Sequence, residues 1–139
     1  MFSGLFQTSY KKNNFEDIQY AIKKTNEYII INTLPINEQD CLIKNTLPYE
    51  EEEKTINELL NNYDFNNKKI IIYGRNTNDE TAEKKYNQLR TLGFSEIYLY
   101  SGGLFEWLLL QDIYGDEEFP TTSKIIDLLK YSGQNKVSI

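Results

Sequence analysis

Residues 69–94 have the sequence KIIIYGRNTNDETAEKKYNQLRTLGF. The run Lys69–Tyr73 holds three consecutive isoleucines, and an apolar run without alternating polar residues is typical of a strand that is covered on both faces. The strand stops at Gly74, and a polar loop then leads into a helix that ends near Leu92. This segment therefore predicts a strand, a tight turn and a helix in direct succession.

The predicted helix carries start and stop signals at both ends. Thr77 and Glu80 have the T-x-x-E spacing of a capping box, in which the two side chains accept free backbone N–H groups of the first turn. Gly93 stands where a left-handed glycine commonly ends a helix. The sequence therefore predicts that the loop and the start of the helix form one tight unit.

Strands and helices alternate on both sides of this unit. Asn13 and Glu16 have cap spacing ahead of an amphipathic helix over residues 15–22, and residues 28–31 form another apolar run. Further helices are predicted from Pro48 to Leu60, over 104–113 and over about 122–131, and a further strand over Ile97–Tyr100. Such alternation predicts an α/β fold with a mainly parallel central sheet and helices on both faces. Because the functional crevice of this class lies beyond the C-terminal ends of the strands, the loop after Gly74 is at the expected site.

Composition excludes several classes of function. The chain has 15 Lys and Arg against 21 Asp and Glu, and the net charge of −6 predicts no binding to nucleic acid or anionic lipid. There is no histidine, so His-dependent triads and His-containing zinc sites are absent. The single cysteine, Cys41, leaves no intrachain disulfide and fits a reducing compartment.

Length and hydropathy indicate the organisation of the chain. The 139 residues fit one domain, so we expect a single domain over residues 1–139. No apolar run approaches the roughly 20 residues that cross a bilayer, and residues 1–10 are too weakly apolar for a signal peptide. These features predict the cytoplasm or another reducing intracellular compartment, without membrane insertion. The abundance of Asn, Ile, Lys and Tyr is typical of an AT-rich genome and carries no functional information.

Several segments together resemble the rhodanese-like family, whose fold is shared by the cell-cycle dual-specificity phosphatases. The matching segments are residues 28–34 for the first strand with its trailing polar position, 42–48 for the next strand and its turn, and 70–73 for the strand that enters the active loop. Two further matches are Leu92-Gly93-Phe94 and YLYSGGLFEW at 98–107. The Gly-Gly-x-x-x-Trp element after a Gly-Phe is the most specific of them. The resemblance covers about residues 14–122 and implies a single rhodanese-like domain with its core there.

In active members of this family, a cysteine directly follows the strand that enters the active loop, and it serves as persulfide carrier or phosphatase nucleophile. This chain has Gly74 at that position, and glycine has no side-chain atom that could attack sulfur or phosphorus. Phosphatase relatives also carry an arginine six positions later, where this chain has Glu80. The family's acidic residue after the first strand is replaced by Asn32, and a frequent arginine by Leu34. The resemblance therefore implies that sulfurtransferase and phosphatase chemistry has been lost.

The loop that corresponds to the family's active loop comprises Gly74, Arg75, Asn76, Thr77, Asn78, Asp79 and Glu80. A strand that enters a tight loop and a helix N-terminus is a natural anion cradle. Asp79 and Glu80 stand in the first turn of that helix, and a capping Glu80 would occupy N–H groups that an anion needs. Arg75 either folds inward and offsets part of this repulsion or lies in solvent. We interpret the loop as a vestigial site that its own residues fill, with no cofactor and no metal.

Two other candidate sites carry less support. Cys41 lies far from the loop in the sequence and no histidine could activate it, so we interpret it as structural. Four carboxylates, one at the end of the predicted helix over 104–113 and three after it, match no recognised calcium-loop spacing and indicate an acidic surface loop. These carboxylates are Asp112, Asp116, Glu117 and Glu118.

The predicted helix over 104–113 is apolar around nearly its whole circumference, which requires burial on every side. One side can cover the sheet, and the remainder either packs against the C-terminal segment or binds another protein. The apolar residues of that segment are Phe119, Ile125, Ile126 and Leu129. If Trp107 faces inward, Phe105 and Leu109 lie nearly opposite to it, and they are the candidate interface.

The sequence thus predicts an inactive rhodanese-like domain that acts as a protein-binding, scaffolding or regulatory module. It is expected not to be an enzyme, and its partner would be an unidentified protein or a second copy of the chain. Two alternatives stay open. One is a sulfurtransferase or phosphatase that uses unrecognised residues, and the other is a structural subunit of a larger assembly.

Overall fold

A computed structural model describes residues 9–124 and 127–132 of the chain. They contain a four-stranded sheet in the order β1-β4-β3-β2, and every pair of neighbouring strands is parallel. The strands are β1 (Lys12–Asn13), β2 (Tyr28–Asn32), β3 (Lys69–Tyr73) and β4 (Ile97–Tyr100). The predicted α/β fold with a parallel central sheet is confirmed.

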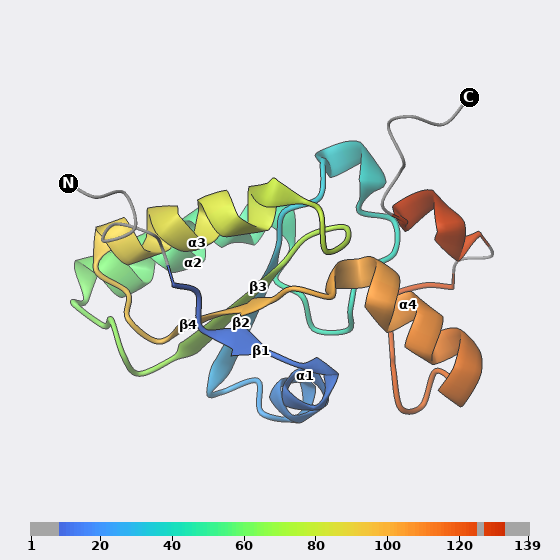
Figure 1. The fold of residues 1–139 in the computed structure, drawn as a ribbon. Helices are drawn as coiled ribbons and strands as arrows, with labels where there is room; N and C mark the ends of the chain where they lie inside the picture. The colour runs from blue at the N-terminus through green and yellow to red at the C-terminus, as the bar shows by residue number, and fades with distance from the viewer. Residues whose placement is uncertain (1–8, 125–126, 133–139) are drawn as a thin grey trace.

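Helices cover both faces of the sheet, as predicted (Figure 1). They are α1 (Phe15–Lys23), α2 (Tyr49–Asn61), α3 (Glu80–Leu92) and α4 (Gly103–Tyr114). Ile70 and Ile72 of β3 pack with α2 and α3, whereas Ile71 and Tyr73 pack with α1 and α4, because successive side chains of a strand point to opposite faces. Burial on both faces explains why β3 is apolar throughout. Within the described residues, none of these helices has the length and hydropathy to cross a membrane.

Local capping groups set where the helices begin and end. α1 follows a capping box of Asn14 and Asp17, in place of the predicted pair Asn13 and Glu16. The Asn14 side chain accepts the Asp17 N–H at 3.1 Å, and the Asp17 carboxylate accepts the Asn14 N–H at 2.9 Å. α3 ends at Gly93, whose φ of 116° lies in the left-handed region, as predicted.

Of the strand and turn expected over residues 42–48, the structure has the turn but not the strand. In the turn, the Thr46 N–H donates to the Ile43 carbonyl at 3.1 Å and Asn45 adopts a positive φ of 68°. One parallel bridge, between Thr46 and Ile30, pairs this segment with β2. The segment therefore lies beside β2 as a turn.

The C-terminal helix predicted over about 122–131 is also wrong. Residues 120–122 lie along the segment just described, where the Thr122 N–H donates to the Leu42 carbonyl at 2.8 Å. Backbone groups that bond to a distant segment are not available to an α-helix. Only a short 3-10 helix, η3 (Leu128–Tyr131), follows in the described part of this region.

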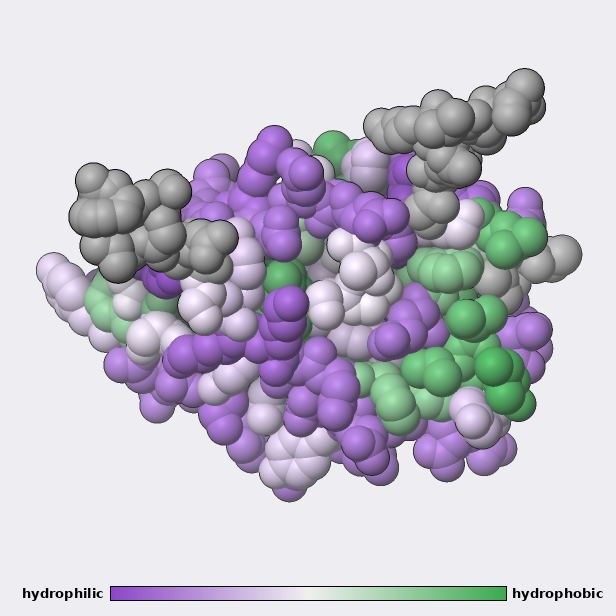
Figure 2. Space-filling model, viewed as in Figure 1, coloured by the Kyte–Doolittle hydropathy of each residue, from purple (hydrophilic) through white to green (hydrophobic). Residues whose placement is uncertain are grey.

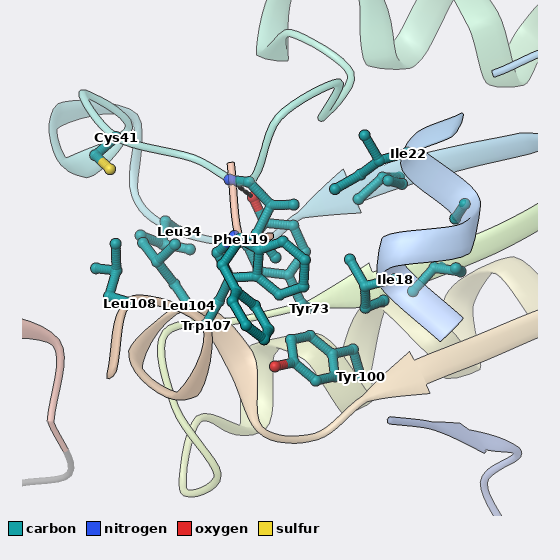
Figure 3. Packing of buried hydrophobic residues seen from close by; sticks show 14 of the residues in the cluster. Ile18, Ile22, Leu34, Cys41, Tyr73, Tyr100, Leu104, Trp107, Leu108 and Phe119 are labelled. Atoms are coloured by element: carbon teal, nitrogen blue, oxygen red, sulfur yellow. Dashed lines mark hydrogen bonds between the residues drawn. The ribbon is translucent and has the colours of Figure 1, made fainter. Parts of the chain in front are cut away.

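Aromatic rings form the centre of the core on the α1 and α4 side (Figure 3). Trp107 is fully buried, and its ring meets Phe119 edge-on with 5.0 Å between centroids and Tyr100 with 6.3 Å. The indole N–H donates to the Pro120 carbonyl at 3.0 Å, which holds the segment after α4 against the helix. This packing places the N-terminal end of α4 next to the loop that follows β3.

Candidate functional site

The loop of residues 74–80 connects β3 to α3 beyond the C-terminal ends of the strands (Figure 1). This is the edge at which the sequence predicts a site. Gly74 is buried, the side chains of Arg75, Asn76 and Asp79 are half-buried, and Thr77, Asn78 and Glu80 are exposed. The residues nearest the sheet therefore decide what the loop can bind.

The carboxylate of Asp79 fills the centre of the loop. Its Oδ2 accepts the Arg75 N–H at 2.8 Å, and its Oδ1 accepts the Thr81 N–H at 3.0 Å and the Thr81 hydroxyl at 2.6 Å. Burial by itself would raise the pKa of Asp79, but the hydrogen bonds from Thr81 and from the Arg75 N–H outweigh it and lower the pKa below its usual value. An ionised side chain of the chain itself thus accepts two of the N–H groups that could otherwise bind an anion at this loop.

The capping box predicted for Thr77 and Glu80 is wrong. Asp79 is the N-cap of α3, and Glu80 is the first helical residue with an exposed side chain. Asp79 can bond forward to the first turn and backward across the loop to Arg75, whereas Thr77 stands two residues before the cap. The interpretation of a self-filled loop therefore rests on Asp79 in place of Glu80.

Position 74 lacks space for a side chain while Asp79 is in place. A Cβ atom added to Gly74 would lie 2.7 Å from the Asp79 Oδ2 and 3.1 Å from the Thr33 Oγ1. The Thr33 hydroxyl is itself held by a hydrogen bond of 2.8 Å to the Thr81 hydroxyl. The loop therefore lacks the thiol, and a side chain at position 74 would have to displace the Asp79 carboxylate.

The N-terminus of α4 closes the loop from another side. The Leu104 N–H donates to the Gly74 carbonyl at 2.9 Å, and the Phe105 N–H donates to the Arg75 carbonyl at 2.9 Å. Gly103 has a φ of 70°, and a Cβ there would lie 2.8 Å from the Gly74 carbonyl oxygen and 2.9 Å from the Asn76 nitrogen. Only glycine satisfies both the positive φ and the close approach. This contact explains the second glycine of the Gly-Gly-x-x-x-Trp element.

Two more segments seal the rim of the loop. The Arg75 guanidinium forms an ion pair with Glu38 of the 3-10 helix η2 (Ile36–Glu38), so its charge is committed to that carboxylate. The Asn76 side chain donates to the Tyr131 carbonyl at 2.8 Å. A cavity of about 20 Å³ remains between the loop, α3 and β4, which is space for about one water molecule and too little for a tetrahedral oxyanion.

Two buried tyrosines support the loop, and the sequence analysis did not single them out. The Tyr73 hydroxyl accepts the Ile43 N–H at 3.1 Å and bonds the Thr46 hydroxyl at 2.8 Å, and the Tyr100 hydroxyl donates to Glu106 at 2.6 Å. Burial raises the pKa of both hydroxyls above the usual value, and the Glu106 carboxylate raises that of Tyr100 further. Both therefore stay protonated and act as structural hydrogen-bonding groups. A tyrosine at the last position of an aliphatic strand is the signal that could have found them.

The other candidate sites show no reactive arrangement. Cys41 is fully buried, and its thiol donates to the Ser123 carbonyl at 3.2 Å. Among the residues that the structure describes, no three carboxylate or thiol side chains lie close enough together to hold a metal ion. Asp116 instead pairs with Lys124 at 3.8 Å.

The outer side of α4 is open to solvent. Leu109 is 40 % exposed and Ile113 is 62 % exposed, whereas Phe105 is half-buried and packs against the core. Leu129, which was expected to cover this helix, is itself exposed, and Ile125 and Ile126 lie outside the described residues. Figure 2 shows the hydrophobic side chains that gather at the end of the molecule where α4 lies. Of the predicted interface pair, Leu109 lies on the open face and Phe105 lies largely inside.

Solved structures with the same fold include proteins of known catalytic class. The BH2092 protein of Bacillus halodurans has a TM-score of 0.59 and 22 % identity, over 73 % of this chain and 74 % of that chain. The single-domain sulfurtransferase RDL2 of Saccharomyces cerevisiae has a TM-score of 0.55 and 17 % identity, over 82 % and 98 %. Ygr203w, a yeast protein tyrosine phosphatase of the rhodanese family, has a TM-score of 0.53 and 14 % identity, over 84 % and 94 %. At these identities the likeness shows a common fold.

The family follows from the sequence match. No curated protein matches the chain. The family model described as "Rhodanese-like domain" matches residues 14–110, which is most of the chain. The match confirms the resemblance that the strands and the Gly-Gly-x-x-x-Trp element indicate, and Gly74 directly follows β3 in this chain. The chain belongs to the rhodanese-like domain family.

Proposed function

We propose that this chain is a rhodanese-like domain without catalytic activity and that it works as a protein-binding module. One observation carries the proposal: the loop after β3 has no cysteine, and the Asp79 carboxylate accepts the Arg75 N–H of the loop and the Thr81 N–H at the start of α3. A lost cysteine alone would leave an open anion site. A filled loop supports the loss of anion binding as well.

The chemistry of the family needs groups that this loop does not supply. Sulfur transfer requires a thiolate that attacks the donor sulfur, and phosphatase chemistry requires a thiolate and donors that stabilise the oxyanion. Here the Asp79 carboxylate would face the incoming anion, and two like charges about 4 Å apart repel by about 1 kcal/mol in water and about 4 kcal/mol near a protein surface. Cys41 is buried away from solvent, and the chain has no histidine to activate it.

The remaining surface supports a binding role. The chain keeps a complete core on both faces of the sheet, while α4 exposes the apolar side chains of Leu109 and Ile113. Neighbouring exposed apolar side chains on a folded domain are typical of a surface that contacts another molecule.

Turnover assays test the proposal. The purified chain should transfer no sulfur from thiosulfate or 3-mercaptopyruvate to cyanide and should release no phosphate from an aryl phosphate, compared with a heat-denatured sample. An active sulfurtransferase assayed in parallel shows that the conditions permit turnover. Cys41→Ser is the matched variant. Turnover that persists in Cys41→Ser would reveal an enzyme that uses unrecognised residues. Turnover by the unmodified chain that disappears in Cys41→Ser would make Cys41 the nucleophile. Either result would overturn the proposal.

A further inference from the structure

An apolar groove of about 390 Å³ lies between α1 and α4. It is lined by Phe15, Gln19, Leu110, Tyr114, Glu118 and Phe119. The rings of Phe15 and Tyr114 both pack near Phe119, with 5.5 and 6.1 Å between centroids. The Gln19 side chain donates to the Glu118 carbonyl at 2.8 Å and ties α1 to the segment after α4. The groove therefore has an aromatic lining that the fold already holds in place.

Exposed side chains of α4 extend this groove into a larger surface. Leu110 and Tyr114 line the groove one helical turn apart, and Leu109 and Ile113 form a second row beside them with the same spacing. Leu109, Ile113 and Tyr114 are all exposed. We call these two rows, together with the groove, the α4 surface.

The rim of the α4 surface is acidic. From residue 112 to residue 119 the chain has four exposed acidic side chains and no Lys or Arg. The acidic residues are Asp112, Asp116, Glu117 and Glu118. Lys124 compensates little of this charge, because its pair with Asp116 is long, at 3.8 Å, and largely exposed.

This charge selects among the possible occupants. Anionic lipid and nucleic acid are repelled by an acidic rim. A second copy of the chain is also disfavoured, because a symmetric contact would bring two such rims together. A protein segment that carries Lys or Arg around its apolar residues is not repelled by the acidic rim.

We infer that the α4 surface binds a segment of another protein that presents apolar side chains flanked by lysines or arginines. The apolar side chains fill the groove, and the basic side chains pair with the rim carboxylates and orient the segment. This inference rests on the proposed binding function and specifies the chemistry of the partner.

A designed pair of peptides supplies the test. The probe is a fluorescently labelled amphipathic helix composed of Leu and Lys, and its counterpart replaces every Lys by Glu. Fluorescence anisotropy with the full chain should show binding of the Leu-Lys peptide that weakens as salt is raised, since added salt screens exposed charge pairs. The Leu-Glu peptide should not bind.

Paired substitutions locate the binding. Leu109→Ser with Ile113→Ser removes the exposed apolar row and should weaken binding by about tenfold or more. Asp112→Asn with Glu117→Gln should weaken it by about fivefold and reduce its salt dependence. The matched control, Glu51→Gln with Glu53→Gln, removes two exposed carboxylates from α2 and should change affinity less than about twofold. Circular dichroism should show unchanged folding in all three variants.

Four results would overturn the inference. They are no binding of the Leu-Lys peptide, equal binding of the Leu-Glu peptide, equal weakening by the α2 control, and dimerisation in sedimentation equilibrium that Leu109→Ser with Ile113→Ser abolishes. The last result would make a second copy the occupant. Sulfur transfer or phosphate release by the unmodified chain would instead overturn the proposed function, so the two failures are distinguishable.

Discussion

The loop after β3 and the outer side of α4 differ in how their side chains are satisfied, although the same helix borders both. In the loop, Asp79 accepts three hydrogen bonds, and the first N–H groups of α4 donate to the carbonyls of Gly74 and Arg75. On the outer side, Leu109 and Ile113 stay exposed to solvent. The polar groups named here in the loop are therefore hydrogen-bonded within the chain, whereas these apolar side chains of α4 are exposed to solvent.

This difference indicates which of the two regions is available to contact another molecule. A catalytic loop needs free N–H groups and space for substrate, whereas here Asp79 accepts the Arg75 and Thr81 N–H groups and the cavity behind the loop has about 20 Å³. Exposed apolar side chains disfavour solubility unless a partner covers them. The contrast supports the proposal that the loop after β3 has no catalytic role and that α4 carries a binding surface.

The largest expected effect separates the two sides of α4. Leu108 is buried and Leu109 is exposed. Leu108→Asp therefore introduces a carboxylate into the core, and Leu109→Asp introduces one on the surface. Leu108→Asp should cost several kcal/mol, a large share of the roughly 5–15 kcal/mol of a small domain, whereas Leu109→Asp should cost less than about 1 kcal/mol. Thermal melting measures both. A collapsed melting temperature for Leu109→Asp would show that this face is covered and would remove it as an interface.

A smaller effect is expected in the loop. Asp79→Ala removes the N-cap of α3 and leaves the Arg75 and Thr81 N–H groups without their acceptor, which should lower the free energy of unfolding by about 1–2 kcal/mol. Asn78→Ala at the exposed neighbouring position is the control and should change it by less than about 0.5 kcal/mol. Urea denaturation measures both values. Equal effects would mean that Asp79 does not hold the loop closed.

The smallest expected effect depends on pH. Because the pKa of Asp79 is lower in the folded chain than in the unfolded chain, its charge stabilises the fold above the unfolded pKa, and this contribution is lost as the pH falls through the folded pKa. Asp79→Asn keeps a capping oxygen without the charge. The unmodified chain should melt at a higher temperature than this variant. The difference should be largest at neutral pH and should shrink below about pH 4. A difference that stays constant down to pH 3 would show that the charge of Asp79 has no role.

Most of the sheet and its helices could be predicted, because their signals are local. The Ile70–Ile72 run and the Gly93 stop signal depend on nearby residues alone. The strand over 42–48 and the helix over 122–131 failed for one physical reason: Leu42 and Thr122 bond to each other across the chain, and no local pattern reports that contact. Long-range hydrogen bonds replaced the elements that local patterns favoured.

The sequence could predict that the loop after β3 has no cysteine. It could not predict how the side chains of the loop are arranged. Gly74 is visible in the sequence once the resemblance is recognised. Adjacent carboxylates at 79 and 80 cannot be told apart by spacing, because either can cap the same helix, and only the contact with Arg75 selects Asp79. The approach of Gly103 to the Gly74 carbonyl and the pairing of Glu38 with Arg75 join distant segments, so they emerge only in the folded chain.

One measurement tests the closed loop most directly: sulfur loading from thiosulfate, read by intact mass spectrometry. Gly74→Cys is compared with Gly74→Cys combined with Asp79→Ser, each together with Cys41→Ser so that only the introduced thiol reports. The thiolate would attack the outer sulfur of thiosulfate and release sulfite, forming a persulfide.

In Gly74→Cys the new Cβ would lie 2.7 Å from the Asp79 Oδ2, so the account predicts little or no added sulfur. Asp79→Ser frees that space and keeps a capping side chain, so the combined variant should gain sulfur measurably faster. Loading of Gly74→Cys alone at the rate of an active sulfurtransferase would contradict the account, because it would show that the loop lost its nucleophile and nothing else.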